Sequence, residues 1–174
     1  TVLQPGDPQW QVTTDLAYDD DAGNPQPDFG NLTSAAVTGI GMAARTTSVS
    51  WGSTGQFPVS VTNALSQTTQ KAYDYSLGVQ TSETDPNGIV TSWQYDAFGR
   101  RSRENRPDGT YSISTPYLCT AWSGACYNWD NGYYRVDQVN YDSAGTTIDW
   151  TVTFHDPFER MVDRASLNRD GNQV

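Results

Sequence analysis

The sequence predicts an all-β protein of consecutive antiparallel β-hairpins, and three observations lead to this fold class. First, Gly78, Gly88, Gly99 and Gly109 follow one another at intervals of 10, 11 and 10 residues, a spacing typical of short strands joined by tight turns. Second, aromatic and β-branched residues are abundant although only 36% of the chain is hydrophobic, and such residues favour pleated strands. Third, the acidic residues are mostly Asp, which favours turns, whereas Glu favours helices.

The turns carry two alternating signatures, and in the first of them an Asp that follows Tyr precedes a Gly. The clearest copy is Tyr95-Asp96-Ala97-Phe98-Gly99-Arg100. Asp is favoured at the first position of a type I turn, and a left-handed Gly at the fourth position can close a hairpin. The copies are Tyr18-Asp19 with Gly23, Tyr73-Asp74 with Gly78, Tyr95-Asp96 with Gly99, and Tyr141-Asp142 with Gly145.

The second signature has Pro at the second turn position and Gly at the fourth. It occurs in Asp85-Pro86-Asn87-Gly88 and in Arg106-Pro107-Asp108-Gly109, where Pro presets φ and Gly closes the turn. A degenerate copy of the first signature is Phe154-His155-Asp156, and in its turn Asp156-Pro157-Phe158-Glu159, Glu stands in place of Gly. Because a side chain disfavours positive φ, we expect that turn to be strained or different.

The predicted strands between these turns are polar to an unusual degree. Ile89, Thr91, Trp93 and Tyr95 share one face of a strand, whereas the next strand, residues 100–105, is polar on both faces. A sheet that is wet on both sides cannot be half of a compact sandwich. We therefore expect either the wall of a hollow structure or a sheet whose faces meet partners.

The repeat divides the chain into four regions. Residues 1–56 form an N-terminal flank with one weak repeat and a loop-rich stretch, and residues 57–113 hold the well-formed repeats. An insertion that contains Cys and Trp follows at residues 114–132, and degenerate repeats occupy residues 133–174. Within the flank, small residues, Pro and Gly over residues 25–44 predict a long loop with one short helical turn near Ala35.

These motifs resemble the YD-repeat, or Rhs, family. The residues that carry the resemblance are Tyr95-Asp96-Ala97-Phe98-Gly99-Arg100, Arg106-Pro107-Asp108-Gly109, Thr62-Asn63-Ala64-Leu65 and Asp85-Pro86-Asn87-Gly88, which alternate at about twenty-one residues. The family includes Rhs polymorphic toxins, the cocoon of Tc insecticidal toxins and the teneurins of animals. The resemblance implies a curved sheet that forms part of the wall of a hollow β-shell.

The resemblance also implies a function. We expect a structural segment of a secreted, or cell-surface, bacterial YD-repeat protein that encloses a toxin or other cargo, with no catalysis, cofactor or metal of its own. Its partners would be the rest of the parent protein or other copies of itself, joined through open sheet edges. Shells of this family often end in a self-cleaving segment with a glycine-rich part. That glycine-rich part is absent here, so the resemblance implies no protease activity.

Two alternatives remain open at this point. The chain could be the subunit of a self-assembling extracellular fibre, because open sheet edges favour pairing with further strands. It could instead be a carbohydrate-binding adhesin module, with Trp93 and Tyr95 on one strand face as a sugar platform.

Charge and hydropathy exclude some partners. The net charge is −10 and the isoelectric point is about 4.2, so the chain repels nucleic acids and anionic lipids. It has no apolar run long enough to span a membrane. We expect neither a nucleic-acid partner nor membrane insertion. The chain begins at Thr1 without an initiator Met, and we expect it to be a piece of a longer protein.

Few residues suggest other chemistry. Cys119 and Cys126 could close a small disulfide loop in a secreted protein. His155 is the one histidine and is interpreted as a strand residue rather than a catalytic base. The acidic run from Asp19 is interpreted as a solvated turn rather than a calcium site. The basic cluster consists of Arg100, Arg101, Arg103 and Arg106. It is expected to form either salt bridges to neighbouring Asp residues on adjacent strands or a site for an anion or acidic partner.

Overall fold

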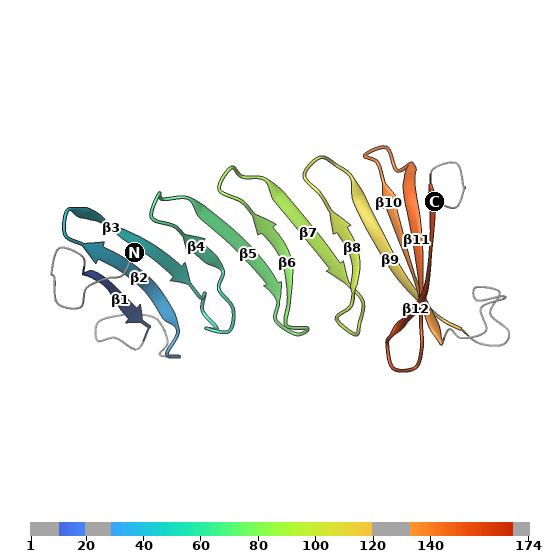
Figure 1. The fold of residues 1–174 in the computed structure, drawn as a ribbon, viewed down its shortest axis with the longest axis horizontal. Coiled ribbons are helices and arrows are strands. Elements are labelled where there is room, and N and C mark those ends of the chain that lie inside the picture. Colours follow the sequence, from blue (N-terminus) through green and yellow to red (C-terminus); the bar gives the residue numbers. More distant parts are fainter. Residues whose placement is uncertain (1–10, 20–28, 120–132, 169–174) are drawn as a thin grey trace. The chain divides into compact units, whose positions relative to one another are not determined.

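The computed structural model describes residues 11–19, 29–119 and 133–168, and every regular element in these ranges is a β-strand. The strands follow one another in sequence order in an antiparallel sheet (Figure 1), which confirms the predicted fold class. They are β1 (Val12–Tyr18), β2 (Leu32–Gly39), β3 (Met42–Ser50), β4 (Ser60–Thr62), β5 (Thr68–Asp74), β6 (Val79–Thr84), β7 (Val90–Tyr95), β8 (Arg101–Asn105), β9 (Tyr111–Leu118), β10 (Tyr134–Tyr141), β11 (Thr147–His155) and β12 (Met161–Asn168). Within the described ranges, no helix has the length and hydrophobicity needed to cross a bilayer.

The chain divides into two compact units, and the first comprises Thr1–Tyr75 with Gln80–Ile89. Its short strand β4 pairs with β3 on one side and with β5 on the other. At one end of β5, the ring of Tyr73 stacks on Phe57 with centroids 4.7 Å apart. The Tyr73 hydroxyl donates to the Pro58 carbonyl at 3.2 Å. These aromatic contacts fasten the loop before β4 to the sheet.

The second unit, Ser76–Val79 with Val90–Val174, holds the narrow core. Val152 and Phe154 of β11 are only 7% and 3% exposed, and they are the buried hydrophobic residues of the described part of the chain. They lie opposite Asp137 and Arg135 of β10, whose side chains form an ion pair of 2.9 Å. Most other strand residues are half-buried or exposed, as the polarity of both strand faces predicts.

The predicted loop over residues 25–44 is wrong for its described part. Residues 32–39 form β2 and residues 42–50 form β3, and Ala35 lies in β2 rather than in a helical turn. Gly39 pairs with Met42, so only two residues, including Gly41 with a φ of 72°, connect the strands. Small residues form strands here because β2 is paired on both sides, by β1 and by β3, and such context outweighs intrinsic propensity.

The predicted insertion at residues 114–132 begins too early. Strand β9 continues to Leu118 and pairs with β10 from Tyr111 opposite Tyr141 to Leu118 opposite Tyr134. The Cys119 N–H donates to the Tyr133 carbonyl at 2.9 Å. The repeat ladder therefore continues through residues 114–118, and residues 120–132 lie outside the described part.

Candidate functional site

The turn at residues 96–100 has the backbone that the first signature predicts. The Gly99 N–H donates to the Asp96 carbonyl at 3.0 Å, and the Asp96 N–H donates to the Arg100 carbonyl at 2.9 Å. Gly99 has a φ of 75°, the left-handed conformation of the residue that closes such a hairpin. The turn therefore fixes the register between β7 and β8.

The Asp96 side chain adds further hydrogen bonds to this turn, and we call this arrangement a carboxylate staple. Asp96 Oδ1 accepts hydrogen bonds from the N–H groups of Phe98 and Arg100 at 2.9 and 3.0 Å. Asp96 Oδ2 accepts from Arg100 Nε and contacts Nη2, each at 2.7 Å. The side chain thus bonds two backbone groups that would otherwise face water, and it also holds the arginine that follows the turn.

The same staple recurs in both turn signatures. The first turn residue accepts from the backbone N–H groups two and four positions later in the turns that begin at Asn63, Asp85, Asp96, Asp142 and Asp156. The turn at Arg106 has the same backbone bonds, but there Asp108 accepts from the Thr110 N–H. The two predicted signatures therefore encode one turn geometry.

The turn at residues 156–159 has the same backbone geometry as the glycine-containing turns, and it is strained. The Glu159 N–H donates to the Asp156 carbonyl at 3.1 Å, as Gly does in the other turns. Glu159 has a φ of 63°, and Ser66 takes the same conformation in the Asn63 turn with a φ of 61°. The fold thus imposes the left-handed conformation even where no glycine is present.

The hydrogen bonds to these carboxylates favour their charged form. The Ile89 N–H lowers the pKa of Asp85 below its ordinary value. The side chain of Arg160 does the same for the pKa of Asp156. The hydroxyl of Thr110 lowers the pKa of Asp108. Because only the carboxylate accepts these bonds fully, the turns are held most firmly when Asp is ionised.

The tyrosines of the first signature differ in their surroundings. Tyr141 stacks on Tyr111 at 4.7 Å, and the Arg103 guanidinium lies 3.9 Å from the centroid of the Tyr111 ring. These three side chains form a column across β8, β9 and β10. Tyr73 stacks on Phe57 as described above, whereas Tyr18 is 38% exposed and Tyr95 pairs with Arg101 beside a β-bulge.

The remaining predicted turn residues lie as follows. Asp19 is buried, and its Oδ1 accepts from the Asn31 N–H at 2.8 Å, whereas Gly23 lies outside the described residues. Gly78, after Asp74, and Gly145 both have positive φ, at 68° and 82°. Gly109, which follows Pro107, has a φ of 83°, and a Cβ built on it would lie 2.9 Å from Ser143 Cβ. This contact makes the two neighbouring turns sensitive to any larger residue.

The arginine cluster is engaged by neighbours within the same unit. Arg100 pairs with Asp96, and both Arg101 and Arg106 pair with Glu104 at 3.0 and 3.1 Å. These carboxylates lie within the same turn or strand rather than on adjacent strands, so the predicted partners were of the right charge but the wrong position. The cluster therefore forms internal salt bridges, while the side chains of Arg100 and Arg101 stay about half exposed.

The predicted sugar platform is partly covered. The Trp93 indole N–H donates to Glu104 Oε2 at 3.0 Å. The Arg101 guanidinium carbon lies 5.1 Å from the centroid of the Trp93 ring. A sugar that stacked on this face would have to displace Arg101. Binding of carbohydrate by Trp93 and Tyr95 stays a prediction.

The remaining predictions concern the two cysteines and the histidine of the second unit. Cys119 is disulfide-bonded, whereas Cys126 lies outside the described residues, so their mutual pairing stays a prediction. His155 stacks on Tyr134 with ring centroids 4.8 Å apart, and its Nε2 lies 3.1 Å from Thr153 Oγ1. Among the described residues, no group of three or more His, Cys, Asp or Glu could hold a metal ion.

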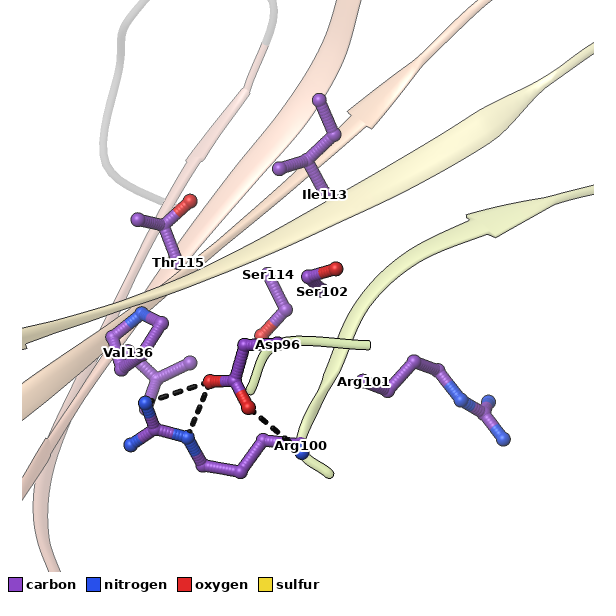
Figure 2. A pocket seen from close by; sticks show the side chains of 9 residues that line it. Asp96, Arg100, Arg101, Ser102, Ile113, Ser114, Thr115 and Val136 are labelled. Atoms are coloured by element: carbon purple, nitrogen blue, oxygen red, sulfur yellow. Dashed lines mark hydrogen bonds and ion pairs between the residues drawn. The ribbon is translucent and has the colours of Figure 1, made fainter. Parts of the chain in front are cut away.

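A cavity of 380 Å³ lies beside the turn at residues 96–100. Its apolar lining comes from Ile113 and Pro116 of β9 and Val136 of β10, with Asp96 and Arg100 beside them. Figure 2 shows Asp96 and Arg100 joined to each other, while the Arg101 side chain extends away from this pair. Two arginines and one aspartate line the cavity, so its lining is positive within an acidic chain.

Sequence reasoning missed three features of these sites. The cavity combines β8, β9 and β10, and no local pattern indicates it. The staple at Asn63 could have been found, because Asn accepts the same backbone bonds as Asp. The pair of half-buried Arg135 and buried Asp137 resembles any surface i, i+2 pair in sequence, and only the strand pairing reveals how far it is buried.

Comparisons with known proteins agree with this architecture. The model of the RHS repeat matches residues 77–111, which span the turns at Asp85, Asp96 and Arg106. A solved structure, described as the crystal structure of TcdB2-TccC3 without its hypervariable C-terminal region, is similar over 84% of this chain with a TM-score of 0.56 and 13% identity. This chain spans only 11% of that structure's chain. No curated protein sequence matches. The repeat and the shared fold confirm the resemblance: this all-β chain contains an RHS repeat at residues 77–111.

Proposed function

We propose that the chain is a wall segment of a β-shell that encloses a toxin or other cargo in a secreted bacterial RHS-repeat protein, and that it has no catalytic role of its own. The observation that carries this proposal is the repetition of one stapled turn along strands that follow sequence order, with very few side chains buried. Its partners are the rest of the parent protein and further copies of the repeat.

A wall needs local rigidity more than a thick core. The hairpins with a stapled turn are each held locally, because the staple satisfies backbone groups independently of neighbouring strands. The strands between turns keep polar side chains on both faces, such as Ser102 and Arg103 of β8. Both faces can therefore contact water or other protein, as a wall between an interior and an exterior requires.

Packing of the one histidine supports a structural role. His155 lies against Tyr134 in β10 and against Thr153 in its own strand. A general base needs a nucleophile within hydrogen-bond reach and a group that orients it. The Thr153 hydroxyl is within reach of Nε2, but Nδ1 faces the backbone carbonyl of Glu159 at 3.3 Å rather than a carboxylate. The stacked ring on Tyr134 is the contact of a residue that packs across a strand pair.

Protease protection tests the enclosing function. The full-length natural protein that contains this chain is incubated with a nonspecific protease, and cargo fragments are followed by mass spectrometry. Enclosure predicts that the cargo survives in the native protein and is degraded once the shell is unfolded. Equal degradation rates in the native and the unfolded protein would contradict the proposal.

A further inference from the structure

Three turn tips expose a large apolar side chain at the third turn position. Leu65, Phe98 and Phe158 are 78%, 83% and 77% exposed. The staple holds each of these tips in one backbone conformation. Rigid, exposed aromatic residues are typical anchors of protein interfaces, because little side-chain entropy is lost on binding.

The Phe158 tip has a second unusual feature. Glu159 follows it in the left-handed conformation, where four other turns have Gly88, Gly99, Gly109 and Gly145. The Glu159 side chain is exposed, and no ion pair joins it to another residue of the described part. Backbone strain of this kind is concentrated at functional sites. The Arg160 guanidinium lies 5.4 Å from the centroid of the Phe158 ring and pairs with Asp156. The charge of this tip that no ion pair within the described residues balances is therefore the negative one of Glu159, beside an aromatic ring.

The cavity beside the turn at residues 96–100 has the complementary character. Its apolar lining comes from Ile113, Pro116 and Val136, and Arg100 and Arg101 also line it. Arg100 keeps its ion pair with Asp96, and Arg101 keeps its ion pair with Glu104. The side chains of these arginines are 57% and 52% exposed, so a second molecule can reach them. Its volume of 380 Å³ lies in the range of about 300–1,000 Å³ of ligand-binding pockets, which suits an aromatic ring.

We propose that the turn at residues 156–160 of one copy of this chain docks into the cavity of a second copy. Phe158 packs on the apolar lining, and Glu159 lies beside Arg100 and Arg101. The complementary charges offset part of the repulsion between two chains of net charge −10. The Phe158 tip and the cavity are different surfaces of the chain, so the contact is heterologous. Repeated contacts of this kind build longer assemblies unless the copies close into a ring.

Sedimentation velocity of the full chain over a concentration series tests this contact. The wild-type chain is expected to associate with rising concentration, and added salt to weaken the association. Phe158→Ala and Glu159→Gly are each expected to raise the Kd at least about tenfold. Leu65→Ala, which removes an equally exposed apolar tip of the first unit, is the matched control and should leave the Kd unchanged.

The Glu159→Gly variant separates docking from folding. Glycine relieves the left-handed strain, so this variant is expected to melt at a higher temperature than the wild type while it associates more weakly. A wild-type chain that stays monomeric at every concentration would overturn the proposal. So would association that survives both Phe158→Ala and Glu159→Gly, or that falls equally in Leu65→Ala.

Discussion

The Asp96 carboxylate divides its two oxygens between the backbone and a side chain. Oδ1 closes the turn through two N–H groups, and Oδ2 holds Arg100. The backbone part was predictable, because Asp at the first turn position and Gly at the fourth have known conformational preferences. The arginine contact was not, since it depends on a long side chain with many rotamers.

Two substitutions at Asp96 separate these parts. Asn keeps the acceptor for the backbone, as Asn63 does naturally, and loses only the ion pair. Asp96→Asn should therefore lower the melting temperature slightly, and Asp96→Ala more. Calorimetry of both variants measures the difference, and equal losses would contradict the importance of the backbone staple.

Replacement of Glu159 by glycine should stabilise the protein. The left-handed φ of 63° at Glu159 costs about 1–2 kcal/mol for a residue with a side chain, and the flexibility of glycine in the unfolded chain offsets part of this. We expect Glu159→Gly to stabilise the protein by about 1 kcal/mol, or roughly 2–4 °C in Tm for a chain of this size. Gly99→Val is the opposite control and should destabilise, because Gly99 has a φ of 75°.

The stapled turns should make stability fall in acid. The folded-state pKa values of Asp85 and Asp156 lie below the ordinary 3.8, so their contribution is complete above that value and is lost as the pH falls through the folded pKa. Burial raises the pKa of Asp137, which gives the opposite sign. Thermal melts from about pH 7 to pH 2 should show a smaller acid loss for Asp85→Asn than for wild type, and an unchanged profile would contradict the staple.

At the scale of elements, the strands that lie between glycine-containing turns were predicted well. Residues 89–95 and 100–105 were expected as strands and correspond closely to β7 and β8. Strands β2 and β3 were missed because their small residues carry no apolar alternation and their connection follows neither turn signature. Their strand conformation depends on pairing partners far away in sequence, which local patterns do not encode.

Phe154 should dominate the stability of the second unit. It is 3% exposed and lies in β11 opposite Arg135, so its truncation leaves a cavity that the sheet cannot readily fill. Phe154→Ala should cost about 3–5 kcal/mol. The control Phe98→Ala, at a tip that is 83% exposed, should stay within about 0.5 kcal/mol. Urea unfolding of both variants measures these costs, and equal costs would show that β11 is not the core.

At the scale of the whole molecule, composition and repeat spacing were sufficient for the fold class. Abundant strand-forming residues, turn-forming Asp and regular glycines all favour the same all-β chain, and such agreement between levels is typical of a sequence that specifies one fold. The strain at Glu159 was also predictable, because Glu stands where the other turns have Gly. The cavity was beyond this reasoning, because it results from strand register, which the repeat pattern describes only on average.

Electron cryo-microscopy of the full-length natural protein tests whether these strands form the wall of a chamber. We expect a hollow β-shell, with strands β1–β12 in its wall, the stapled turns as hairpin ends, and cargo density inside. A compact protein in which these strands surround a solid core, or one with no enclosed chamber, would contradict it.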